Sequence, residues 1–308
     1  MSSFKELKSR IAGVKNIQQI TRAMKMVAGA RLRRAEEAIL TLRPYSSRLD
    51  WVCARLLTGA MGGEHAFLTE RPVRAFAVLA ICSDRGLCGA YNNRVIDATL
   101  ELLAQRPGQS HLLLVVGHKG VTRLKRAGCQ VHRAYDDIFN PVHFTTAQAI
   151  RAELASLFLS GRADEVLVVF SEFFSPMRHP VITRRLLPCP VDGHRRQIVD
   201  HYDREVPQGV HVAAEELAEP AREVYVYEPD YQTICDRLME YNLGVQVYWA
   251  LLEAQASEHG ARMMAMDNAT ENAEDMIEEL TLLMNRVRQE SITSEMLDVV
   301  GGAEATKE

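Results

Sequence analysis

The chain has 308 residues, 47% of them hydrophobic and only 6% aromatic, and a formal net charge of -4. That length and apolar content allow a sizeable core, and the few aromatics favour helix seams filled by Ala, Leu, Met and Val. No apolar run approaches the roughly 20 residues that cross a bilayer, and charges stand where a signal peptide needs an apolar stretch. A membrane-spanning or secreted protein is therefore not expected.

The net charge conceals a strong asymmetry between the two ends. Residues 1–36 contain nine Lys or Arg against two acids, whereas residues 267–308 contain eleven acids against three bases. Ends of opposite charge attract each other, or attract partners of matching sign.

The first segment, residues 1–57, carries apolar residues at steps of three and four, which predicts an amphipathic helix. Steps of three between Val14 and Ile20 depart from a strict heptad and should shift the apolar stripe around the helix. Pro44 should kink or interrupt this helix, because its ring removes one backbone hydrogen bond and crowds the preceding turn. The seam residues expected here are Ile11, Ile17, Ile20 and Val27.

Residues 58–71 lose this periodicity and contain three glycines, which predicts a linker. From residue 72 to residue 229, short apolar runs alternate with amphipathic stretches, as is typical of a parallel, doubly wound sheet. We therefore predict an inserted Rossmann-like α/β domain. The expected strands are 76–82, 112–116, 131–134 and 166–170, with helices at 89–105, 119–127 and 145–159 and further edge strands at 181–187 and 224–227.

The most enzyme-like feature is SDRGLCGAYNNR, residues 83–94, which follows the first strand. A glycine-containing turn can present backbone amides to phosphate, but this one lacks both G-x-G-x-x-G and G-K-[ST]. Ser83, Asp84 and Cys88 suggest a nucleophile beside an acid, but no His is placed to act as the base. We interpret the segment as a structural turn in which Ser83 or Asp84 caps the following helix.

The cysteines and histidines predict no metal site and no cofactor. The six cysteines are scattered without a C-x-x-C pair, so free thiols in a reducing compartment are the default interpretation. The ten histidines are dispersed, and His194 and His201 form no recognisable ligand set with a carboxylate pair.

Residues 230–308 return to a helical pattern, with apolar residues spaced as in a coiled-coil seam and acids on the outer positions. Seventy such residues would reach roughly 100 Å, so the helix needs a partner along its length. The N-terminal helix is the candidate within the chain, because antiparallel pairing buries both stripes and joins opposite charges. The seam residues expected here are Ala273, Met276, Leu280, Leu283 and Val287.

The basic N-terminal helix also has other interpretations. It is compatible with nucleic-acid binding, membrane attachment or an organellar transit peptide, since it is rich in Arg and poor in acids. We favour pairing with the acidic C-terminal helix, because both the stripes and the charges match. The remaining basic face would prefer an acidic protein surface.

Three long blocks of the sequence, residues 8–38, 83–94 and 250–305, resemble the gamma subunits of F-type ATP synthases in order, spacing and chain length. They begin KSRIAGVKNIQQITRAMKMVAG, SDRGLCGAYNNR and ALLEAQASEHGARMMAMDNATENAEDM. The resemblance implies an antiparallel coiled coil that turns inside a ring of three alpha and three beta subunits. It also implies an α/β domain against the epsilon subunit and the membrane-embedded c-ring.

The resemblance further implies a rotary coupling subunit without catalytic residues, since alpha and beta make or hydrolyse ATP. The basic face of the first helix would meet an acidic loop of the beta subunits. Shaft-to-ring contacts are implied at Met24, Lys25 and Arg31 and at Arg288, Gln289, Thr293 and Glu295. A supporting role at the base of the shaft is implied for Ser83, Asp84, Arg85, Gly86, Gly89 and Asn92.

Two of these assignments have specific consequences. Arg288 and Gln289 offer donors that can bind a beta-subunit loop, whereas Met24 is equally consistent with packing in the seam.

Because the resemblance begins within the first ten residues, we expect no transit peptide and a bacterial-type enzyme. Its location would be peripheral, on the cytoplasmic face of the plasma membrane, with membrane contact only through the c-ring and no nucleic-acid partner.

Overall fold

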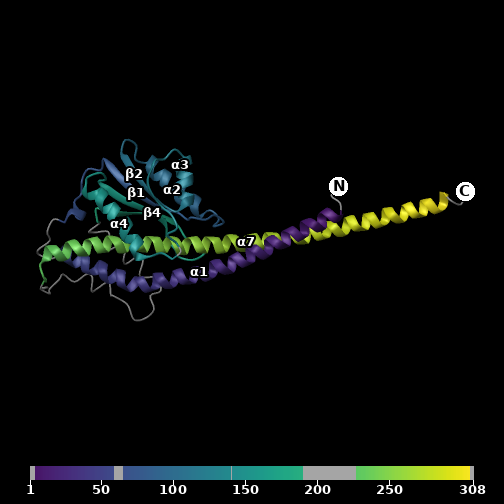
Figure 1. Ribbon diagram of the computed structural model, residues 1–308, viewed down its shortest axis with the longest axis horizontal. Helices are drawn as coiled ribbons and strands as arrows, with labels where there is room; N and C mark the ends of the chain where they lie inside the picture. Colours follow the sequence, from purple (N-terminus) through teal and green to yellow (C-terminus); the bar gives the residue numbers. More distant parts are fainter. Residues whose placement is uncertain (1–3, 59–64, 140, 190–226, 306–308) are drawn as a thin grey trace. The chain divides into compact units, whose positions relative to one another are not determined.

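The computed structural model describes residues 4–58, 65–139, 141–189 and 227–305 (Figure 1). The chain forms two compact units, one of residues 1–30 with 262–308 and the other of residues 31–261. Two long helices, α1 (Phe4–Thr58) and α7 (Tyr231–Ala305), each contribute to both units. The predicted boundaries separate the helices from the α/β domain, whereas the compact units divide each helix in two.

The larger unit, residues 31–261, contains a five-stranded sheet in the order β3-β2-β1-β4-β5. Four strands are parallel and β5 is antiparallel to β4, so the predicted doubly wound fold and the edge strand at 181–187 are confirmed. The edge strand predicted at 224–227 has residues 224–226 outside the described part of the chain. The strands are β1 (Ala75–Ile81), β2 (Ser110–Val116), β3 (Val131–Tyr135), β4 (Glu165–Ser171) and β5 (Val181–Leu187).

Helices cover both faces of this sheet, which explains why its central strands are apolar without alternation. Alternate residues of β1, including Phe76 and Val78, pack into one core with α2 (Tyr91–Ala104) and α3 (His118–Arg126). The chain then returns across the sheet after β3. Right-handed crossovers place α4 (Phe144–Leu159), which contacts β4, on the opposite face.

Helix α1 continues through Pro44 as one 55-residue helix, so the predicted interruption is wrong. Packing on both sides of the proline explains this result: Ile39 and Leu49 are 3% and 7% exposed. Ser46, also buried, donates a hydrogen bond from Oγ to the carbonyl of Arg43. Because tertiary packing supplies most helical stability in proteins, the loss of one backbone hydrogen bond does not end the helix.

Part of the predicted linker lies in the described part of the chain. Residues 59–64 lie outside the described part of the chain, but residues 66–68 form the short 3-10 helix η1 (Ala66–Leu68). Phe67 is 1% exposed and makes an edge-to-face contact with Phe158. The buried aromatic ring anchors a segment whose glycines, taken alone, predict a loop.

Of the helices in the described part of the chain, none contains a stretch long and apolar enough to cross a bilayer.

Candidate functional site

In the smaller unit, one line of α1 side chains faces inward at alternating steps of four and three. The line begins at Leu7 and Ile11, and its later members Thr21 and Ala28 are 8% and 2% exposed. Alternation of four and three is the spacing of a coiled-coil seam. The members are Leu7, Ile11, Val14, Gln18, Thr21, Lys25 and Ala28.

Three contacts define the pairing of α1 with α7 within this unit. The hydroxyl groups of Thr21 and Thr270 share a hydrogen bond of 2.8 Å, and Lys25 forms an ion pair with Asp267. A Cβ added at Gly29 would lie 3.3 Å from Sδ of Met263. Each advance along α1 is matched by a return along α7, so the two helices run antiparallel, as predicted.

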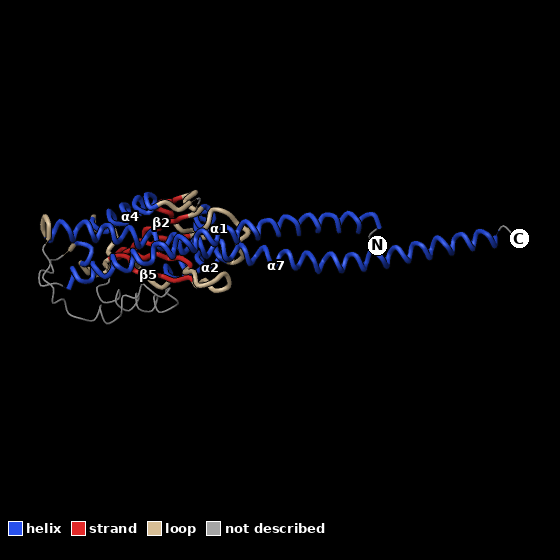
Figure 2. The backbone as a smooth tube through the Cα atoms, turned by 90° about the horizontal axis from the view of Figure 1, so that it is seen from below, coloured by secondary structure: helices blue, strands red, loops and turns tan. Residues whose placement is uncertain are grey.

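Helix α7 extends beyond the start of α1. The pairing of position 21 with 270 and of 25 with 267 brings the first turn of α1 level with residues near 287. Figures 1 and 2 both show the C-terminal part of α7 continuing past the N-terminal end of α1. The last turns of α7 therefore lack α1 as a partner and present their side chains all round.

Several predicted seam residues lie outside the seam. Ile17, Ile20 and Val27 are 55%, 59% and 54% exposed, and Met276 and Leu283 are 49% and 44% exposed. Ile11 and Ala273 are buried, while Leu280 and Val287 are half-buried. On α1, the prediction followed apolar residues through steps of three, which move a line around the helix. On α7, the predicted spacing was that of a seam, but Ile277 and Met284, one position after Met276 and Leu283, are half-buried in their place.

Polar residues occupy the seam where the prediction placed isoleucines. Gln18, Thr21 and Lys25 continue the spacing of four and three from Leu7, although none of them is apolar. Following the spacing regardless of residue type would have found them. Polar seam positions select register and partner at some cost in stability.

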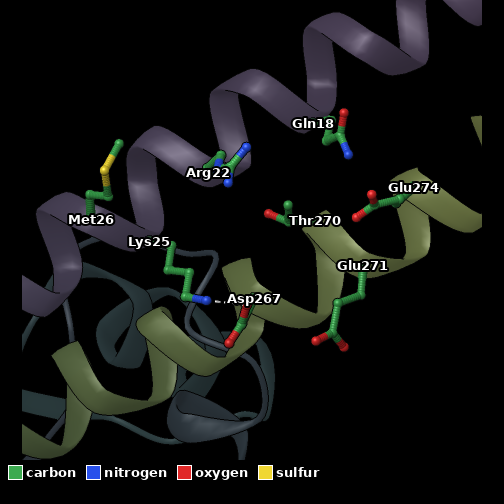
Figure 3. Close-up of a pocket in the computed structure, with 8 residues that line it drawn as sticks. All are labelled: Gln18, Arg22, Lys25, Met26, Asp267, Thr270, Glu271 and Glu274. Carbon is green, nitrogen blue, oxygen red and sulfur yellow. Dashed lines mark hydrogen bonds and ion pairs between the residues drawn. The ribbon is translucent and has the colours of Figure 1, made fainter.

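A hollow of about 350 Å³ lies beside this polar seam, and Figure 3 shows the side chains that line it. Basic side chains reach it from α1 and acidic side chains from α7, and Lys25 points at Asp267. These two side chains are 40% and 30% exposed, and such a pair contributes only about 0–1 kcal/mol. The hollow is lined by Gln18, Arg22, Lys25, Met26, Asp267, Thr270, Glu271 and Glu274.

The residues implied as ring contacts fall into two groups. On α7, all four are exposed: Arg288, Gln289, Thr293 and Glu295. On α1, Met24 is half-buried, Lys25 pairs with Asp267, and Arg31 is exposed in the larger unit.

Large apolar side chains also lie exposed on the helices of the smaller unit. On α1 they include Met26 at 66%, beside the misassigned isoleucines, and on α7 they include Leu282 at 72%. Met296, Leu297 and Val299 continue this exposure along the last turns of α7. Apolar surface of this extent is typical of a protein–protein contact.

The turn after β1 is held together by its own polar groups. Asn92 accepts a hydrogen bond from the backbone N–H of Ser83 at 2.9 Å and donates to Ser83 Oγ at 2.8 Å. It also donates to Sγ of Cys88 at 3.2 Å, and Gly89 has a φ of 56°. The turn therefore uses its hydroxyl, amide and thiol groups internally.

Neither Ser83 nor Asp84 caps α2, contrary to the prediction. Ala90 occupies the N-cap position of α2 and makes no side-chain hydrogen bond there. Asp84 instead accepts a hydrogen bond from the backbone N–H of His118, the first residue of α3. β1 and β2 are parallel neighbours, so their carboxyl ends lie side by side. Asp84, which follows β1, therefore lies at the start of α3, which follows β2, rather than at the start of α2, the next helix in the sequence.

A stretch of α7 occupies the carboxyl edge of the sheet at its switch point. In doubly wound sheets, ligands bind where neighbouring strands send their connections in opposite directions, here between β1 and β4. Ser257 Oγ donates to the carbonyl of Ser171 at 3.0 Å, and Ala261 packs with Cys88 and Tyr91. The protein's own helix fills the place where a dinucleotide would lie.

Glu253 is a buried acid at this contact. Its carboxylate oxygen accepts a hydrogen bond of 2.8 Å from the backbone N–H of Phe173, just beyond β4. Burial raises the pKa of Glu253 to about 7, and the neighbouring Glu172 adds to the rise. The acid ties α7 to the sheet rather than facing an open site.

Comparison with known proteins supports one family. The family model described as ATP synthase matches residues 3–306. The ATP synthase gamma chain of Heliobacterium modesticaldum is 37% identical over 305 residues, covering 99% of both chains. That of Geobacter sp. strain M21 is 37% identical over 310 residues and covers both chains completely.

Solved structures share the fold. A chain from the Euglena gracilis mitochondrial ATP synthase (OSCP/F1/c-ring) covers 98% of this chain and 94% of its own length, with a TM-score of 0.66 and 17% identity. One from the Tetrahymena thermophila central stalk/c-ring covers 81% of this chain and 99% of its own, with a TM-score of 0.58 and 23% identity. The chain belongs to the family of ATP synthase gamma chains.

Proposed function

We propose that this chain is the central-stalk rotor of a bacterial F-type ATP synthase. It turns inside a ring of alpha and beta subunits and couples ion flow to ATP synthesis or hydrolysis. Family membership supports this function, as do solved neighbours from central-stalk and c-ring assemblies. The observation that carries it is the smaller unit, an antiparallel helix pair with apolar and charged residues exposed on its outside.

The last turns of α7 suit contact with a surrounding ring. They extend past the start of α1, so their side chains are available on every side. Their exposed apolar residues gain from burial, while Arg288 and Gln289 supply donors for a partner loop. Charged contacts at an exposed surface are individually weak, which suits a shaft that must exchange one partner for the next.

The chemistry belongs to the partner subunits in this proposal. The switch-point edge of the sheet is filled by α7, and the turn at residues 83–92 uses its polar groups internally. The larger unit then acts as the base of the rotor, where Ser83, Asp84, Arg85, Gly86, Gly89 and Asn92 hold the turn against neighbouring helices. Epsilon and the c-ring are the partners at that base, on the cytoplasmic face of the plasma membrane.

Charge reversal at Arg288 tests this function in the assembled enzyme. We expect Arg288→Glu to leave assembly intact while ATP-driven ion pumping falls more than ATP hydrolysis, because one contact with the ring is lost. Inverted membrane vesicles report both activities in the same preparation.

Arg286 supplies the matched control, since it is also exposed on α7 but is not among the implied contacts. Arg286→Glu should keep the wild-type ratio of pumping to hydrolysis. An equal loss in both variants, or an unchanged ratio in both, would remove Arg288 from the contact. Failure of the chain to copurify with alpha and beta subunits would overturn the function itself.

A further inference from the structure

A second cavity lies in the larger unit, between α1, the connection from β3 to α4, and α7. Its volume is about 440 Å³, within the range of small-molecule sites. Arg31, Arg34 and Ala38 line it from α1, Val142 from the connection, and Leu252 and His259 from α7. All of these residues belong to the same compact unit.

The cavity exists because α1 carries small side chains at this level. Ala35 and Ala38 face it, at spacings that share one face with Arg31 and Arg34. An alanine side chain ends at Cβ, so it leaves space between the helices that a leucine would fill. The small side chains of α1 at this level are therefore one reason for the space.

The opposite wall is firmly held. Gln255 of α7 donates a hydrogen bond of 2.8 Å to the carbonyl of Phe139, and Phe139 and Val142 are 4% and 7% exposed. Phe144 and Tyr248 make an edge-to-face contact 5.5 Å between ring centroids. Side chains held in place in this way form a preformed wall, as is usual in small-molecule sites.

The charge at the cavity is of one sign. Arg31 and Arg34 line its α1 wall, and no acidic residue is among those that line it. Within the described residues, neither arginine forms an ion pair with an acidic side chain. Arginine pairs prefer planar oxyanions such as carboxylate and phosphate.

We propose that this cavity binds a small amphipathic anion. The acidic head lies against Arg31 and Arg34, and the apolar body lies along Ala38, Val142 and Leu252. The volume of about 440 Å³ favours a small molecule, since a protein segment would lie along a longer groove. A buried polar side chain in the lining, His259 at 3% exposure, limits how far a purely apolar ligand can enter.

Calorimetric titration of the full-length chain tests the proposal, with 4-phenylbutyrate as the probe. The amine of the same body, 4-phenylbutylamine, is the charge control. We expect saturable binding of the carboxylate at one site and binding of the amine at least about tenfold weaker, since only the carboxylate can accept hydrogen bonds from the two arginines.

Three variants locate the binding. The double variant Arg31→Gln/Arg34→Gln and the filling variant Ala38→Phe should each weaken carboxylate binding by about tenfold or more. Arg33→Gln, an exposed neighbour that does not line the cavity, should bind as wild type. The double variant changes only surface residues, so it keeps the test decisive if Ala38→Phe fails to fold.

Absence of saturable binding, equal affinity for carboxylate and amine, or equal weakening in Arg33→Gln would each overturn the proposal. Binding of hexaglutamate through the same two arginines, without binding of phenylbutyrate, would assign the arginines to an acidic protein segment instead. The titration uses the chain without its ring, so it can fail or succeed independently of the rotor function.

Discussion

Helix α7 lies in two very different environments along its length. Between residues 250 and 261, every side chain except Gln255 is buried, including those of Glu253, Ser257 and His259. Beyond residue 262, in the smaller unit, Met266 and Ala273 are the buried positions among the residues whose burial is described. The first stretch works as a core element, whereas the second keeps most of its surface available to partners.

This contrast shows how one continuous helix carries two roles. A helix buried on all sides contributes hydrophobic free energy at every position and tolerates little change. A helix buried along one line contributes little at its outer positions, so their identity is open to selection for contact with other subunits. The same contrast orders the expected effects of substitution.

The largest effect is expected from leucine truncation in the buried stretch. Leu251 is fully buried, so Leu251→Ala should lower the free energy of unfolding by about 2–5 kcal/mol through lost burial and a cavity. Leu282, 72% exposed on the same helix, is the control and should lose no more than about 0.5 kcal/mol. Urea denaturation measures both variants. Similar losses of unfolding free energy would show that the two stretches of α7 do not differ in their contribution to stability.

The pH dependence of stability should reveal Glu253. The pKa of Glu253 in the folded protein is about 7, above the ordinary value of 4.5, so its contribution to the free energy of unfolding is complete below pH 4.5 and is lost as pH rises through 7. Over that range the free energy of unfolding should fall by up to about 3 kcal/mol because of this acid, and Glu253→Gln should remove that fall. Urea denaturation at several pH values measures the difference. Glu295→Gln, at an exposed position, should leave the slope unchanged.

The hydroxyl pair in the seam should show a smaller, coupled effect. Thr21→Val alone removes one partner of the 2.8 Å hydrogen bond and should cost about 1 kcal/mol. Adding Thr270→Val should cost less than it does alone, because the bond between the two hydroxyls is already lost and Thr270 keeps only its bond to the carbonyl of Met266. A double-mutant cycle measures the coupling, and strictly additive losses would show that the two residues do not interact.

The smallest effect is expected from the ion pair between Lys25 and Asp267. Both side chains are partly exposed, so a double-mutant cycle with Lys25→Met and Asp267→Asn should give a coupling below about 1 kcal/mol. The coupling should shrink further at high salt. A coupling above about 2 kcal/mol would mean that this pair, rather than the apolar seam residues, holds the helices together.

The elements could be predicted from sequence more securely than the seam. Runs such as residues 76–82 and 166–170 are continuous and apolar, so a buried parallel strand was the natural expectation for each. The prediction of the seam was wrong at Ile17 and Ile20 because it gave apolar character more weight than spacing. In the structure the heptad spacing continues, so Gln18 and Thr21 face inward.

The connections were the least predictable. Asp84 caps α3, 34 residues along the chain, because parallel strands bring their carboxyl ends to one edge. The glycines in residues 58–71 predicted a linker, although Phe67 within it is buried. Pro44 predicted an interruption of α1, but the helix continues because residues on both sides of the proline are packed. Each of these outcomes depends on contacts between segments far apart in sequence.

By itself, the sequence determined the α/β alternation, the two long helices and their antiparallel match, since hydrophobic period and charge are local properties of a chain. Only the tertiary structure decided which helix face turns inward, because several lines of side chains on α1 compete and packing against α7 selects one. Tertiary packing also decided that residues 253–261 of α7 fill the switch point, since no local pattern shows which segment will cover the edge of a sheet.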